Sequence, residues 1–136
     1  IWDTSYIRLM LMRKSHEEAR SDCVIQRGNL VTIKDISDSG DDKEKKAKYL
    51  NNKLLYDLMV KHNIWKAYIG LSDDKKEGEW KWPDGGAVEW QNWDWNGVWN
   101  RTDYNCAVIT NGFENAPWKH INCNHRTYYF CQIPMF

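Results

Sequence analysis

The side chains best suited to chemistry in this chain lie close together near its C-terminus, in the segment HINCNH (residues 120–125). Two imidazoles and a thiol at this spacing are ligands that zinc accepts. Along a strand, however, side chains alternate between faces, so Cys123 and His125 would share one face and His120 the other. The three groups would then not converge on one ion. We therefore predict no zinc site in this segment.

The four cysteines, at positions 23, 106, 123 and 131, have a second possible chemistry. None of them forms a Cys-x-x-Cys pair, which argues against a ribbon-type zinc site and against a thioredoxin-like motif. An even number of cysteines without such a pair favours two disulfides and an oxidising compartment. Their positions alone leave three pairings open.

No arrangement of reactive side chains indicates catalysis. The sequence shows no Ser/His/Asp or Cys/His constellation, and the acidic residues gather in polar, turn-like stretches. We therefore predict that the chain is not an enzyme. The triplet Asn100-Arg101-Thr102 is an N-glycosylation sequon, so we expect a glycan on Asn100 of a secreted or ectodomain protein.

Charge and length limit the partners. Nineteen Lys and Arg balance nineteen Asp and Glu in 136 residues, so no global field directs the chain toward nucleic acid or anionic membranes. No apolar run is long enough to insert in a membrane, and the first residues lack a signal-peptide layout. We expect one domain, residues 1–136, excised from a longer extracellular protein.

A helix should organise the first quarter of the chain. Ser15 and Glu18 form a capping box, which predicts that the helix starts at Ser15. Ala19 and Cys23 lie four residues apart and therefore share one helix face. Gly28 is suited to the C-cap, so the helix should end just before it.

The next segments alternate between apolar runs and one highly charged stretch. Residues 7–12 and 29–33 are short apolar runs typical of buried strands. Asp35–Lys48 is charged and almost free of apolar residues, and it has no assigned role beyond that of a solvated loop. A second helix should then run to about His62, because four apolar residues recur at helical spacing: Ala47, Leu50, Leu54 and Leu58.

From Trp65 onward the sequence pattern changes to strands. Five runs separated by Gly, Asp and Asn fit this pattern: residues 67–71, 79–82, 105–110, 118–123 and 128–133. Helices come first and antiparallel strands later, without strand–helix–strand alternation. This order indicates an α+β fold.

Two of these segments resemble a known signature. Residues 67–71 (AYIGL) and 77–85 (EGEWKWPDG) are similar to the WIGL…EGxWxWxDG signature of C-type lectin-like domains. Further matches stand in the family's order and extend the resemblance over essentially the whole chain: Gly28–Ile33, Cys106-Ala107, Trp118, Cys123 and Phe130-Cys131. The resemblance implies the short form of that fold, with two helices, antiparallel sheets, a long loop region, and the disulfides Cys23–Cys131 and Cys106–Cys123.

The principal calcium motif of the family is missing. In sugar-binding members, a Glu-Pro-Asn or Gln-Pro-Asp triplet and a later Asn-Asp pair hold both calcium and sugar. This chain has Gly97-Val98-Trp99 and Lys119-His120 at those places, and Tyr104 where the family has a glutamate. Too few oxygens remain for a hard cation, so we predict no calcium there and no cofactor. Chelation by Asp94 and Asp103 through a rearranged loop is the alternative.

An auxiliary calcium position of the family survives in part. Asp73 and Glu77 match two of its acidic positions, whereas the later partners read as Asn100 and Asn105. Asp73 and Glu77 are therefore weak calcium candidates. The alternative is that both residues only solvate a turn.

Four of the nine tryptophans lie in WQNWDWNGVWN, residues 90–100. Trp95 and Trp99 stand in the loop with which this family meets ligands, where a large ring can anchor a ligand or fold back to replace calcium as a support. Four other tryptophans stand at positions that the family fills with core aromatics, and we expect them to pack in the core together with Trp93: Trp80, Trp82, Trp90 and Trp118.

We expect an extracellular recognition module that binds an extracellular or cell-surface protein, or a glycan, without calcium. The predicted ligand-binding residues are Trp95, Asn96, Trp99, Lys119 and His120. The alternative is a true lectin in which loop tryptophans and amides contact the sugar, with a displaced calcium.

Overall fold

The computed structural model describes residues 5–34, 50–88, 90–94, 103–113 and 115–135 of the chain. The charged stretch Asp35–Lys48 and the predicted site residues Trp95, Asn96, Trp99 and Asn100 lie outside these ranges. The described elements are, in chain order, β1 (Ser5–Lys14), α1 (His16–Ile25), β2 (Asn29–Leu30), α3 (Leu50–Lys61), β3 (Lys66–Ser72), β4 (Cys106–Thr110), β5 (Trp118–Ile121) and β6 (Thr127–Pro134). Neither described helix has the length and apolar character needed to cross a membrane.

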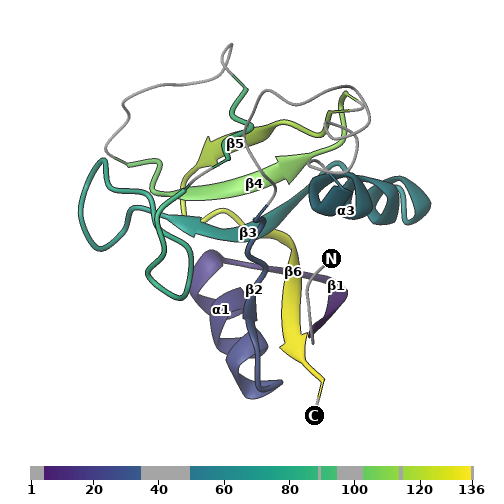
Figure 1. Cartoon of the computed structure of the whole chain (residues 1–136), viewed down its shortest axis with the longest axis horizontal. Coiled ribbons are helices and arrows are strands. Elements are labelled where there is room, and N and C mark those ends of the chain that lie inside the picture. The colour runs from purple at the N-terminus through teal and green to yellow at the C-terminus, as the bar shows by residue number, and fades with distance from the viewer. Residues whose placement is uncertain (1–4, 35–49, 89, 95–102, 114, 136) are drawn as a thin grey trace.

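The strands form one mixed sheet in the order β1-β6-β3-β4-β5, with β2 pairing with β6 beside this path (Figure 1). All pairs are antiparallel except β3–β6, which is parallel and corrects the expectation of purely antiparallel strands. A parallel pair needs a long connection, and residues 73–126 provide it here. β1 pairs with β6 so that Ser5 lies opposite Pro134, which brings the two ends of the described chain together.

The two helices cover opposite faces of this sheet. Tyr129 and Cys131 of β6 pack in the cluster that contains Ala19 and Cys23 of α1. Phe130, between them, packs in the larger cluster that contains α3 and the tryptophans. Because neighbouring side chains on a strand point to opposite faces, this alternation separates the two halves of the core.

The helix α1 has Ser15 as its N-cap and ends before Gly28, as predicted, but its C-cap is not Gly28. The Ser15 hydroxyl accepts from the Glu18 amide at 3.4 Å, and the Glu18 carboxylate accepts from the Ser15 amide at 3.1 Å. The C-cap is Gln26, and Arg27 takes the left-handed conformation (φ 69°) expected of Gly28. Gly28 is needed for another reason, because a Cβ there would lie 2.2 Å from the backbone oxygen of Gln132.

Three further expectations need correction. β1 is an edge strand without a fully buried residue, since only β6 covers one of its sides. Residues 79–82 form no strand; only Lys81 bridges, to Ser72 and Ala87. In α3, Leu55 and Met59 are fully buried, whereas Leu54 and Leu58, which were predicted to face the core, are half-buried. The buried face of the helix is therefore shifted by about one residue from the predicted face.

Both disulfides that the resemblance implied are present. Cys23–Cys131 joins α1 to β6, and Cys106–Cys123 joins the start of β4 to the turn after β5. The first bond links α1 to β6, the strand that pairs with β1, β2 and β3. The second bond links the end of β5, which carries Lys119 and His120, to β4. Cys123 is therefore not available to a metal, which removes the sulfur ligand from the zinc hypothesis.

Candidate functional site

Trp118, the first residue of β5, is the centre of an aromatic cluster. It is fully buried, and three other tryptophan rings meet it edge-on, with centroids at 5.7 Å for Trp82, 5.4 Å for Trp90 and 5.8 Å for Trp93. Edge-to-face contacts of this kind add to the effect of burial itself. These four tryptophans are core residues, as predicted, whereas Trp80 is half-buried.

Two asparagines fasten this cluster to the turn before β5. The indole N–H of Trp118 donates to the Asn52 side chain at 2.8 Å. The side-chain amides of Asn52 and Asn92 both donate to the backbone oxygens of Asn115 and Ala116. Asn52 could not be predicted as a core residue, because an asparagine on an amphipathic helix carries no signal in the sequence that it is buried.

Residues 92–94 run alongside the start of β5 and thereby position an ion pair. The Trp118 amide donates to the Asn92 oxygen and the Asp94 amide donates to the Trp118 oxygen, both at 2.8 Å. This pairing sets Asp94 opposite Lys119, with 3.6 Å between the carboxylate and the ammonium nitrogen. The Lys119 side chain is 51% exposed and that of Asp94 18% exposed. Asp94 was considered only as an alternative chelator, and here it partners a lysine.

The neighbouring residue, His120, lies against aromatic rings. Its imidazole stacks on Trp93, with centroids 4.0 Å apart and planes within 10°, and its centroid lies 5.0 Å from that of Trp80. Of the five predicted ligand-binding residues, the structure thus describes Lys119 and His120, side by side on β5. We call Trp80, Asp94, Lys119 and His120 the loop surface, because the long loop continues directly from Asp94 in the sequence. The buried Trp93 supports this surface through its stacking contact with His120.

Two side-chain oxygens at the auxiliary calcium position have no hydrogen-bond partner among the described residues. Asp73 is 3% exposed; its Oδ2 accepts from the Gly78 amide at 2.8 Å, and its Oδ1 has no hydrogen-bond partner among the described residues. Asn105 Oδ1 is also buried without such a partner, and the Asn105 backbone oxygen accepts from the Asp73 amide. Asp73 is therefore not a solvated turn residue, unlike the exposed Glu77.

The charges at this position fit a cation in part. Desolvation, a hydrogen bond to Asp73 and repulsion by the Asp73 charge together raise the pKa of Glu77. A cation would relieve that repulsion, with Asp73, Glu77 and Asn105 as its ligands. Calcium takes six to eight oxygens, so water or residues outside the described ranges would have to complete the shell.

Comparisons with known proteins identify the family and the fold of the chain. Residues 12–133 match the family model described as "Lectin C-type domain". The chain is 30% identical over 133 residues to C-type lectin lectoxin-Lio3 of Erythrolamprus poecilogyrus, covering 94% of this chain and 74% of that protein. The chain spans between 27% and 60% of the length of four other curated relatives.

Two solved structures share the fold at low identity. Human lithostathine superposes with a TM-score of 0.78 at 19% identity, covering 96% of this chain and 84% of that one. A calcium-independent type II antifreeze protein superposes with a TM-score of 0.73 at 19% identity, covering 98% and 88%.

Proposed function

This chain belongs to the C-type lectin domain family, and from that premise we propose that it is an extracellular recognition module whose loop surface binds its ligand without calcium at the principal site. The ligand is a protein surface, or a glycan bound by a different chemistry. Trp95, Asn96 and Trp99 complete this proposed site, on the strength of their place in the sequence.

The observation that carries the proposal is the Lys119–Asp94 ion pair. Lys119 and His120 stand where sugar-binding members of the family have the chelating Asn-Asp pair. A calcium ion there would meet an ammonium group, whose charge repels it, and the nearby carboxylate of Asp94 already has a cationic partner 3.6 Å away. His120 is stacked on Trp93, so its ring is held by the aromatic cluster.

Other features support the setting of this function. Two disulfides favour an oxidising compartment, which supports an extracellular location. The family consists of recognition modules that are generally not enzymes, and we assign this chain no catalytic role. The fold also occurs in a protein described as calcium-independent, so the fold itself does not require the ion.

A second candidate function rests on a different observation. Asp73 Oδ1 and Asn105 Oδ1 have no hydrogen-bond partner in the part of the chain that the structure describes, and this favours a displaced cation beside Glu77. In that case the chain is a true lectin, with Trp95, Trp99 and neighbouring amides contacting the sugar. A calcium requirement for binding distinguishes this function from the first one.

The test is a binding screen on a glycan array and on an array of extracellular proteins, each with calcium and with a chelator. We expect binding to survive the chelator and to weaken in Lys119→Ala. Lys53→Ala is a matched control, because Lys53 is equally exposed (51%) and pairs with Asp57 on α3. Binding that disappears with the chelator and is unchanged in Lys119→Ala would reject the first function and favour the second.

A further inference from the structure

Basic side chains from three separate segments meet at one end of the sheet. The end of β1 lies there because β1 runs antiparallel to β6, and the start of β3 lies there because β3 runs parallel to β6. Lys14 pairs with Thr127 on one side of β6, and the Thr127 hydroxyl donates to the Lys66 backbone oxygen on the other side. We call the following residues, none of which belongs to the loop surface, the basic end: Arg13, Lys14, Trp65, Lys66, His125 and Arg126.

Arg126 fastens the basic end to α1 and to β1. Its Nη1 donates to the Glu18 carboxylate at 2.6 Å, and its Nη2 donates to the Arg13 backbone oxygen at 3.1 Å. The Arg13 guanidinium itself lies 5.4 Å from the centre of the Tyr128 ring, which is a cation–π distance. Both arginines are exposed residues, so their charged groups are held in position and still reach solvent.

The basic end has more cations than carboxylates. Within the described ranges, Glu18 is the one carboxylate that forms an ion pair with it. Arg13, Lys14 and Lys66 form no ion pair with any described residue. Besides desolvation, the charges of Lys66 and Arg13 lower the pKa of His125, so cations predominate around its ring. The charge of the whole chain is balanced, so this excess is local and attracts an anionic group.

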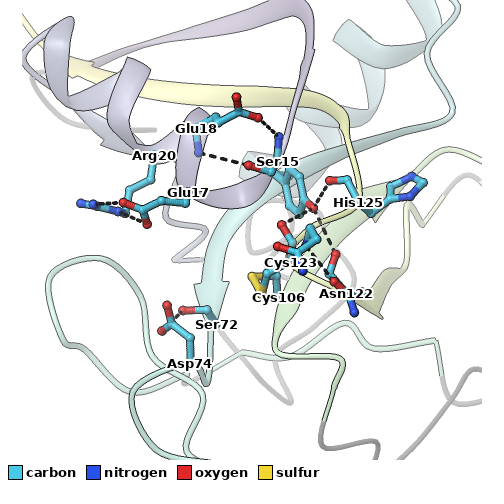
Figure 2. The surroundings of a disulfide bond; sticks show 12 residues. Ser15, Glu17, Glu18, Arg20, Ser72, Asp74, Cys106, Asn122, Cys123 and His125 are labelled. Atoms are coloured by element: carbon cyan, nitrogen blue, oxygen red, sulfur yellow. Dashed lines mark hydrogen bonds and ion pairs between the residues drawn. A yellow bond between two sulfur atoms is a disulfide. The ribbon is translucent and has the colours of Figure 1, made fainter.

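The turn that carries His125 is held in place from the core. The Tyr68 hydroxyl donates to the His125 backbone oxygen and lies 3.3 Å from the backbone oxygens of Asn122 and Cys123. Cys123 is also fixed by its disulfide to Cys106. Figure 2 shows the His125 ring pointing away from these groups. A surface whose backbone is already ordered loses little conformational entropy when a partner binds.

An exposed tryptophan stands next to these charges. Trp65 directly precedes Lys66, and it is 69% exposed. In the parallel pair, Ala67 stands beside Tyr128, so Trp65 and Arg126 occupy matching positions two residues earlier. Tryptophan is enriched at the centres of protein interfaces, because its large ring buries much apolar area. The basic end therefore offers an apolar anchor beside cationic groups.

We propose that the basic end binds an acidic segment of a partner protein, in which an apolar side chain stands next to two or three carboxylates. Arg13, Lys14 and Lys66 pair with the carboxylates, and Trp65 packs against the apolar side chain. Neighbouring strands are about 4.8 Å apart, so the cations of β1, β6 and β3 span about 10 Å, the length of a short extended peptide. A nucleic acid or a membrane would extend its charge over carboxylates elsewhere on this neutral chain, which favours the peptide.

The test is fluorescence anisotropy with a short fluorescein-labelled peptide in which three glutamates surround one leucine. We expect binding that weakens about tenfold when NaCl is raised from about 50 to 300 mM, because salt screens exposed charges. Arg13→Gln combined with Lys66→Gln should weaken binding about tenfold. Trp65→Ala should weaken binding of this peptide, and should have no effect on a peptide in which serine replaces the leucine.

Controls separate this surface from the loop surface. Lys53→Gln on α3 and Lys119→Gln on β5 should leave peptide binding unchanged, so this proposal and the proposed function can fail independently. Arg13→Glu combined with Lys66→Glu should lose the acidic peptide and bind its lysine counterpart, and the melting temperature reports whether each variant folds. The proposal is overturned if the peptide does not bind at low salt, if Lys119→Gln weakens it as much as the basic-end variants do, or if only heparin or phosphatidylserine vesicles bind.

Discussion

The Lys119 ammonium lies 3.6 Å from the Asp94 carboxylate, at the place where the sequence resemblance puts the family's chelating Asn-Asp pair. An exposed ion pair of this kind stabilises a fold by only about 0–1 kcal/mol, so its consequence concerns binding more than stability. The pair puts a positive charge where the ion would have to enter.

We therefore predict that calcium has little effect on the stability of the chain. A ligand that binds only the folded state raises the melting temperature by mass action. The melting temperature in millimolar calcium should exceed that in chelator by no more than a few degrees. If calcium raises the melting temperature further and Asp73→Asn abolishes that increase, a calcium ion binds at Asp73 and Glu77. That result would contradict our prediction that the chain has no cofactor.

Asn52→Ala should destabilise the fold, because Asn52 is buried and bonded to Trp118 at the start of β5. The substitution leaves the buried Trp118 indole N–H without its acceptor and removes two bonds to backbone oxygens, at an expected cost of about 2–4 kcal/mol in the free energy of unfolding. Urea denaturation measures it. Lys53→Ala, on the exposed side of the same turn of helix, should change the free energy by under about 0.5 kcal/mol.

The shared acceptors of Asn52 and Asn92 make a second comparison possible. Both side chains donate to the backbone oxygens of Asn115 and Ala116. The double variant should therefore not lose the sum of the two single losses. Strictly additive losses would show that the two asparagines act independently.

Trp90→Ala and Trp99→Ala should separate the core role of one tryptophan from the binding role of the other. Trp90 is 9% exposed and packs edge-on against Trp118, so its truncation should cost roughly 3–5 kcal/mol of stability. Trp99→Ala should leave the melting temperature nearly unchanged and weaken ligand binding at least about tenfold. If Trp99→Ala lowers the melting temperature as much as Trp90→Ala does, Trp99 supports the loop and is not a contact residue.

His16 should make stability depend on pH. Burial lowers the pKa of His16 below its ordinary value of 6.5; the carboxylates of Asp74 and Glu17 oppose this effect and Arg20 adds to it. The folded state then binds the proton more weakly than the unfolded chain does. Its contribution to stability is fully present above pH 6.5 and is lost as the pH falls below that value.

The measurement is the free energy of unfolding between about pH 8 and pH 5, above the range in which carboxylates titrate. His16→Gln should flatten the decline. His125→Gln is the control: desolvation and the charges of Lys66 and Arg13 also lower the pKa of His125, but this residue is exposed. Equal slopes in the wild type and in His16→Gln would contradict the prediction.

Asn100 should carry a glycan when the chain is made in a secretory host, because Asn100-Arg101-Thr102 is a complete sequon. Mass spectrometry before and after glycosidase treatment reports its occupancy. Thr102→Ala removes the sequon and retains Trp99, so the same variant shows whether a glycan shields that ring. An unmodified Asn100 in secreted material would contradict the prediction.

Short-range sequence patterns and the family resemblance were enough to predict several parts of this structure. The capping box of α1 could be predicted because its donors and acceptors lie within four residues of each other. The resemblance gave the disulfide partners and the buried tryptophans, since cysteine order and aromatic positions are features of the family's sequence. The resemblance also predicts that Lys119 and His120 replace chelating residues of the family.

The tertiary structure decided what depends on segments that meet from distant parts of the chain. The pairing of Lys119 with Asp94, the bond from Trp118 to the buried Asn52 and the edge-on contact of His16 with Tyr68 each join residues from separate parts of the chain. The parallel pairing of β3 with β6 likewise depends on how residues 73–126 return to the sheet. Sequence spacing carries no information on such contacts, because they follow from which faces the packed core brings together.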